Sequence, residues 1–280
     1  MKKLIIQTVI LVMFPFLGHS QSEFSIFGGY GFTGLHCNAI AGNTTIGSGA
    51  QYGLGYRYFF GDAFGVGMNV AFTRYKTGFS AEKIDLAYRA KDIEGTEFEF
   101  RSSVTGYEET QDVAFLQIPV LLHLQIGNFY LSGGVKAGIP LFGQYGSTAS
   151  ALKNSGYYIE DDYEYTTQRF MGFGAFNEVS SQGDFEYRIN PVFSVTLETG
   201  LKVELGYVPS FYFGFYVDYG LNNTTYKGSS QFVGYNTASP ADFTLNSAVS
   251  SQYSQNKPIA DKIAPFAIGV KMAFALGRNY

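Results

Sequence analysis

Residues 116–141, LQIPVLLHLQIGNFYLSGGVKAGIPL, decide the fold. Alternate positions are apolar from 116 to 126, and the pattern returns from 129 to 141 after the two-residue turn signal Gly127-Asn128. Each arm is about a dozen residues long, which exceeds the ~5–6 residues of a typical soluble strand and suffices for the ~9–11 that a tilted strand needs to cross a bilayer. The stretch therefore predicts one hairpin of a transmembrane β-barrel, apolar outside and polar inside.

The same alternation recurs along the chain and predicts eight strands in all. Beside the two arms above, the apolar faces run through 24–32, 52–60, 64–72, 193–205, 211–219 and 266–276. The connections between them alternate long and short, an asymmetry typical of outer-membrane barrels. The predicted fold is an all-β, eight-stranded antiparallel up-and-down transmembrane β-barrel. A soluble barrel or sandwich is the alternative, because a period of two does not say which face is inside. An unbroken apolar outer face would make a soluble barrel aggregate, and this favours the membrane.

The chain divides into a signal and one domain. Residues 1–20 have a basic start, an apolar stretch and a small or polar end, which predicts a cleaved secretory signal peptide, with an uncleaved anchor as the alternative. Residues 21–280 are the predicted barrel, with both termini in the periplasm. The predicted long external loops are 34–48, 78–111, 144–189 and 222–262. Within the second loop, residues 80–91 are compatible with a short helix, and 97–104 with a strand that continues beyond the membrane.

Composition narrows the function classes. The net charge is −4, and only 15% of residues are charged. With no basic block, there is no electrostatic case for nucleic-acid binding. A single cysteine, Cys37, excludes an intramolecular disulfide framework and a cysteine cluster for zinc.

Two segments carry a resemblance to a known family. The hairpin above and the terminal strand PFAIGVKMAFAL, residues 265–276, resemble the small outer-membrane β-barrel domain family of Gram-negative bacteria, which includes OmpA/OmpX-type and PorT-like proteins. The resemblance covers roughly residues 24–276. It implies an outer-membrane location, contact with membrane lipid and lipopolysaccharide, and insertion by the barrel-assembly machinery. The peptidoglycan-binding domain that follows the barrel in OmpA has no counterpart here, so tethering to the cell wall is not expected.

The alternation also predicts which charges lie inside the barrel. Seven charged residues fall on the inner face: Arg57, Lys136, Glu198, Lys202, Glu204, Asp218 and Lys271. Because a lone charge in a narrow lumen is costly, we expect them to form ion pairs, with Lys136 as the partner of Glu198. An ion or proton path is the alternative. Side chains just fill a barrel of eight strands, so no large pore is predicted.

Few residues suggest chemistry. The chain has no nucleophile elbow, HExxH or paired-carboxylate motif, and His123 lies near the short-turn end, so we predict no catalytic residue, cofactor or metal. The run 160–164 is acidic but lacks the spacing and the glycine of an EF-hand. Tyrosine provides contact area with a polar tip, which predicts a recognition loop formed by Tyr157, Tyr158, Asp161, Asp162, Tyr163 and Tyr165.

Together these features predict an integral outer-membrane barrel with a structural or surface-recognition role through its external loops, toward an unidentified surface ligand or envelope partner. Two alternatives stay open. One is a component of an envelope machine, such as a PorT-like secretion accessory. The other is an enzyme that modifies outer-membrane lipid.

Overall fold

The structure, a computed structural model, describes residues 21–184, 189–205, 209–224, 230–254 and 257–277. The predicted signal peptide, residues 1–20, lies outside these ranges. None of the helices in the described ranges is both long enough and apolar enough to cross a membrane.

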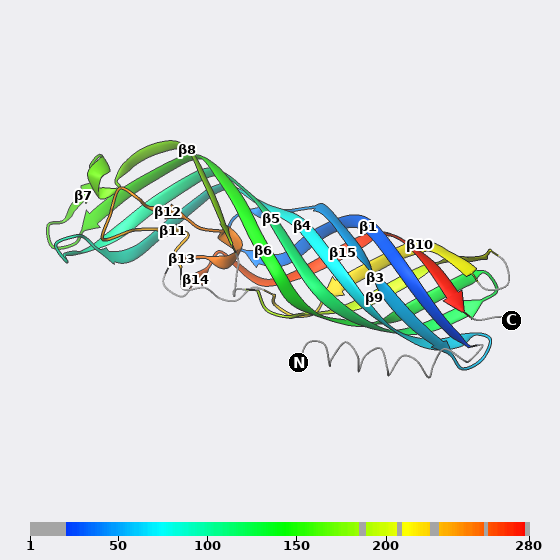
Figure 1. Cartoon of the computed structure of the whole chain (residues 1–280). Coiled ribbons are helices and arrows are strands. Elements are labelled where there is room, and N and C mark those ends of the chain that lie inside the picture. Colours follow the sequence, from blue (N-terminus) through cyan, green and yellow to red (C-terminus); the bar gives the residue numbers. More distant parts are fainter. Residues whose placement is uncertain (1–20, 185–188, 206–208, 225–229, 255–256, 278–280) are drawn as a thin grey trace.

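Eight antiparallel strands close into a ring (Figure 1). In ring order they are β1 (Ser22–Ala39), β3 (Gly47–Phe59), β4 (Phe64–Lys91), β5 (Glu97–Ile126), β6 (Phe129–Tyr158), β9 (Val192–Glu204), β10 (Pro209–Gly220) and β15 (Ala260–Gly277). Pairing of β1 with β15, from Glu23 opposite Gly277 to Ala39 opposite Ala260, closes the ring. The predicted eight-stranded all-β fold is confirmed. The first strand begins and the last strand ends beside the short turns.

The closed ring decides which face is inside. On β5, Val120 and Leu122 are exposed, whereas Gln117 and His123 are buried. The same holds around the ring, where the exposed large side chains are apolar and the interior is largely polar and aromatic. A closed barrel with this arrangement matches a lipid-facing exterior.

Three strands run far beyond the length that a bilayer requires. β4 has 28 residues, and β5 and β6 have 30 each, whereas a tilted strand needs only ~9–11 to cross. The segments 78–111 and 144–189, predicted as loops, are therefore mostly strand in the described residues, and residues 80–91 are strand rather than a short helix. The first loop, 34–48, likewise begins with the end of β1.

A line of skipped backbone pairing crosses these strands, and we call it the crease. It explains why segments 78–111 and 144–189 were predicted as loops. Backbone pairing is skipped at one level, at Glu82 on β4, Gly106 on β5, Ser150 on β6 and Glu178 on β8 (Gly174–Asp184). Gly106 and Glu178 have φ angles of 62° and 53°. On β5, the buried positions are even-numbered from 98 to 104 and odd-numbered at 107, 109 and 111. Residues from both sides of the crease share one core, so the backbone conformation at the crease compensates for the slip in alternation.

We expect Gly106→Ala to destabilise the creased sheet by about 1–2 kcal/mol, the cost of placing a Cβ in the left-handed region. A Cβ there would also meet Ser150 Oγ at 2.5 Å. Gly146→Ala on β6 is the matched control, because the nearest atom to its Cβ is at 4.0 Å. For both variants, urea unfolding of the creased sheet is measured, with protease resistance as the readout. Equal effects of the two substitutions would contradict a strained crease.

Beyond the lipid-facing band lies a folded unit that we call the head, residues 43–45, 78–111, 144–184, 230–254 and 257–258 (Figure 1). Its sheet adds β8 and the short strands β2 (Asn43–Thr45) and β7 (Tyr163–Tyr165) to β4–β6. Short elements pack on one side: β11 (Val233–Gly234), β12 (Thr244–Leu245), β13 (Gln252–Ser254), β14 (Lys257–Pro258), η2 (Arg169–Met171) and η3 (Ala248–Ser250). The head has its own core, in which Phe98, Phe100, Leu152, Phe173 and Phe232 are fully buried.

Candidate functional sites

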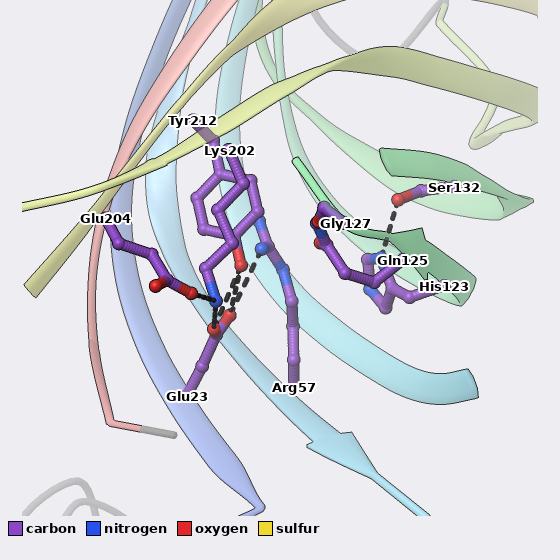
Figure 2. Close-up of polar contacts among 9 residues, drawn as sticks. All are labelled: Glu23, Arg57, His123, Gln125, Gly127, Ser132, Lys202, Glu204 and Tyr212. Atoms are coloured by element: carbon purple, nitrogen blue, oxygen red, sulfur yellow. Dashed lines mark hydrogen bonds and ion pairs between the residues drawn. The ribbon is translucent and has the colours of Figure 1, made fainter. Parts of the chain in front are cut away.

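Glu23 is the centre of a charged cluster near the short turns (Figure 2). Its carboxylate lies 3.4 Å from Arg57 Nη1 and 3.4 Å from Lys202 Nζ, and Tyr212 donates its hydroxyl to both oxygens, at 2.9 and 2.8 Å. The guanidinium of Arg57 also lies over the Tyr212 ring, 4.3 Å from its centroid. Sequence analysis missed Glu23, although it precedes Phe24 and so has the parity of the inner face.

Glu204 differs from its predicted place. Its side chain is 52% exposed, and it contacts Lys202, whose Nζ lies 3.4 Å away. It therefore sits at the rim, whereas Arg57 and Lys202 are buried. Rim exposure means that Glu204 adds little to the stability of the cluster, because an exposed pair is screened by water.

A second layer of charges contains two ion pairs. Lys136 Nζ lies 2.8 Å from Asp218, and Lys271 Nζ lies 2.6 Å from Glu198. All four side chains are buried. The predicted pairing of Glu198 with Lys136 is therefore wrong, although both side chains are buried in the interior as predicted.

Strand register explains the different partners. On the neighbouring strands β6 and β9, Ser132 is opposite Glu198 and Lys136 is opposite Ser194. Lys136 and Glu198 are thus offset by four positions, or ~13 Å at ~3.3 Å per residue. Each observed pair instead reaches across one intervening strand. For Lys271 that strand is β10, where the opposing residue is Gly214, whose missing side chain leaves room for the lysine.

A serine and a histidine meet in the barrel interior. His123 Nδ1 and Ser132 Oγ are 2.6 Å apart on the paired strands β5 and β6 (Figure 2). These are the atoms of a hydrolytic dyad, but the two residues are only 6% and 1% exposed. Catalysis requires a substrate within reach of the base, so this contact acts as a packing hydrogen bond between strands.

Glu109, also missed, is a buried acid in the head. It accepts hydrogen bonds from Tyr107 Oη at 2.5 Å, Gln111 Nε2 at 2.9 Å, Ser247 Oγ at 2.6 Å and the Ala248 amide at 2.7 Å. Burial raises the pKa of Glu109, and these donors oppose the shift. The cluster joins β5 to η3 across the barrel mouth. Its hydrogen bonds are strong when the acceptor is the ionised carboxylate. No sequence signal pointed to it, because the residues that meet are 138 positions apart.

The predicted recognition loop forms the distal end of the head, but its residues face different ways. Asp161, Asp162 and Tyr163 are exposed, and Tyr157 is partly exposed. Tyr158 is buried: its ring stacks on Phe98 at 5.2 Å, and its hydroxyl donates to Asp92 at 2.9 Å. Burial, together with that carboxylate, raises the pKa of Tyr158. Tyr165 is half-buried and packs against Tyr163, with ring centroids 4.8 Å apart. In the described residues, no group of three or more His, Cys, Asp or Glu is arranged to hold a metal ion.

A closed ring of eight strands with an apolar exterior and paired charges inside defines an integral outer-membrane β-barrel. The family model for the outer membrane protein beta-barrel domain matches residues 17–226, and the chain belongs to that family. The predicted resemblance is confirmed. No curated protein sequence matches the chain.

Several solved structures are similar to this chain. Ail, the attachment invasion locus protein of Yersinia pestis, is 11% identical, with a TM-score of 0.34, over 91% of this chain and 99% of that chain. OprG from Pseudomonas aeruginosa is 13% identical, with a TM-score of 0.33, over 93% and 99%. The outer membrane protease OmpT from Escherichia coli is 8% identical, with a TM-score of 0.33, over 91% and 96%.

Proposed function

We propose that this outer-membrane protein is a surface-recognition protein whose barrel anchors the head outside the cell. The observation that carries the proposal is the length of β4, β5 and β6, which continue without a break from the barrel into the head. A site on continuous strands is held more precisely than one on a loop. The head is thus a rigid support for a binding surface.

The orientation follows from the asymmetry of the two ends. One end of the barrel has the tight turns at Gly61 and Gly127, the start of β1 and the end of β15. The other end has the head. Outer-membrane barrels place short turns in the periplasm and long connections outside. On the outer face just above the lipid-facing band, Arg74 and Asp112 form a bidentate pair, at 2.7 and 2.5 Å, and such charges belong in water. We therefore place the head outside and the termini in the periplasm.

The interior supports recognition rather than transport. Its buried charges all contact an opposite charge, and five aromatic side chains occupy the lumen beside them: Tyr75, Phe115, Tyr130, Tyr212 and Tyr216. Side chains fill a barrel of this size. The distal end of the head, in contrast, exposes large apolar groups, with exposed fractions of 71% for Ile93, 56% for Tyr163 and 76% for Phe170. Exposed apolar groups beyond the membrane favour contact with a partner.

Photo-crosslinking in intact cells tests this function. A photoreactive residue replaces Phe170 at the distal end of the head or, as the matched control, Asp62 in the short turn after β3. We expect light-dependent adducts with a surface component at position 170 and none at position 62. An impermeant maleimide, applied to Phe170→Cys and Asp62→Cys in a Cys37→Ser background, should label only the first.

Two results would contradict the proposal. Labelling of Asp62→Cys alone would invert the orientation. Adducts at position 62 only would instead support the alternative role in an envelope machine, because its partners would be reached from the periplasm. Cys37 itself is a poor reporter, since it is half-buried against the head core.

A further inference from the structure

The head sheet has a cleft over the face that carries Arg101 and Lys153. The cleft has a volume of about 570 Å³ and is lined by residues of β4, β5, β6, β7 and β13. Leu86 of the head core and the buried Ser102 also contribute to its lining. The lining residues that matter most are Ala87, Arg101, Ser103, Lys153, Ser155 and Glu164. They alternate along their strands with core residues such as Phe100 and Leu152, so these six side chains lie on the face of the sheet that points away from the core.

Small and long side chains alternate across the paired strands, and this alternation explains why the surface of the sheet has a depression here. Across the strands, Ala87 is opposite Arg101 and Arg101 is opposite Ser155, while Ser103 is opposite Lys153. Small side chains therefore lie among long ones on a surface where neighbouring strands are ~4.8 Å apart. The small residues form a floor of methyl and methylene groups with hydroxyls, and the long residues form a charged rim.

The rim is held in place by contacts among its own residues. Arg101 Nε donates to Glu99 at 2.6 Å, and Arg101 Nη1 lies 3.6 Å from Glu164. The same guanidinium lies over the ring of Tyr157, 4.4 Å from its centroid. Ser155 donates its hydroxyl to Glu164 at 2.6 Å. A rim fixed in this way loses little conformational entropy when a ligand binds.

The charges of the lining cancel. Asp85 and Glu164 are balanced by Arg101 and Lys153, and Asp85 is also bonded to Lys83 at 2.8 Å. An anionic ligand would lie against carboxylates, and a cationic ligand against the guanidinium and ammonium groups. The rim still offers strong donors from arginine and lysine and strong acceptors from the two acids. The ligand that fits is neutral, with many groups that both donate and accept hydrogen bonds.

We propose that this cleft binds a short neutral oligosaccharide. A pyranose ring has an apolar C–H face, which suits the floor formed by Ala87, Ser103 and Ser155, and a belt of hydroxyls, which suits the charged rim. The volume lies within the usual range of small-molecule sites, roughly 300–1,000 Å³. The inference rests on the proposed surface-recognition function and names the chemistry of one ligand of the head.

Glycan binding by the full-length, refolded protein tests the inference. The protein is kept in a zwitterionic detergent without a sugar headgroup and applied to an array of neutral trisaccharides, each with a sulfated counterpart. The neutral trisaccharide that binds most tightly is then titrated by calorimetry against the wild type and against Ser103→Trp, in which the indole fills the floor of the cleft. Thr105→Trp is the control, because Thr105 is on the same strand and face but outside the cleft.

We expect wild type and Thr105→Trp to bind a neutral trisaccharide with similar affinity, and Ser103→Trp to bind at least about tenfold more weakly. Gel mobility confirms that each barrel is folded. The inference is overturned if no neutral glycan binds, if only sulfated glycans bind, or if the two tryptophan variants bind equally. Adducts at position 170 without any glycan binding would reject only the oligosaccharide. Their absence would reject the recognition function itself.

Discussion

Glu198→Gln should lower the stability of the folded barrel by about 3–5 kcal/mol, because it leaves the buried ammonium of Lys271 without its counter-charge. The two groups are 2.6 Å apart, and neither residue is more than 5% exposed. Adding Lys271→Met should restore much of the loss, since the pair is then replaced by neutral groups of similar size. The measurement is the urea concentration at the midpoint of unfolding in lipid vesicles. Gel mobility monitors the unfolding, because the chain has no tryptophan for a fluorescence signal.

Lys136→Met provides the matched control for this rescue. Lys136 is also buried in the barrel interior, but its partner is Asp218, at 2.8 Å. Combined with Glu198→Gln it should therefore give a further loss, and Lys136→Met should be rescued by Asp218→Asn. Rescue of Glu198→Gln by Lys136→Met would mean that the pairs form between neighbouring strands, as the sequence predicted, and not across an intervening one.

Phe98→Ala should unfold the head locally while the barrel stays intact. Phe98 is fully buried, stacks on Tyr158, and meets Phe173 and Tyr235 edge-on at 5.6 and 5.1 Å. Removing a buried phenylalanine costs about 3–5 kcal/mol through lost burial and the cavity left behind. We expect rapid proteolysis within 78–111 and 144–184, with unchanged gel mobility of the barrel core.

Phe170→Ala is the control for the head, because its side chain is 76% exposed and truncation removes little packing. It should leave the rate of proteolysis unchanged. If Phe98→Ala instead lowers the stability of the barrel and head together, the two are one cooperative unit, and the head is not an independent platform. If it has no effect on proteolysis, the aromatic core does not stabilise the head.

The membrane-spanning architecture could be predicted from the sequence because its signals are local. The alternation through Leu116–Ile126 and the turn at Gly127-Asn128 depend only on neighbouring residues, and the length of an uninterrupted alternating run can be compared directly with the ~9–11 residues that cross a bilayer. Parity also predicts the inner-face position of charges such as Lys136 and Glu198, and the structure buries both. The head was hidden because the crease at Gly106 shifts the alternation by one residue, and periodicity analysis then finds no continuous strand.

The tertiary structure alone decided which groups meet. Whether Glu198 pairs with Lys136 or Lys271 depends on the offset between strands, and parity along a single strand carries no information about that offset. Glu109 meets Ser247 because a distant segment folds back over the barrel mouth. The cleft around Ser103 exists because register places small residues of several strands side by side. Local pattern fixes which face a side chain takes, and only the closed sheet fixes its neighbours.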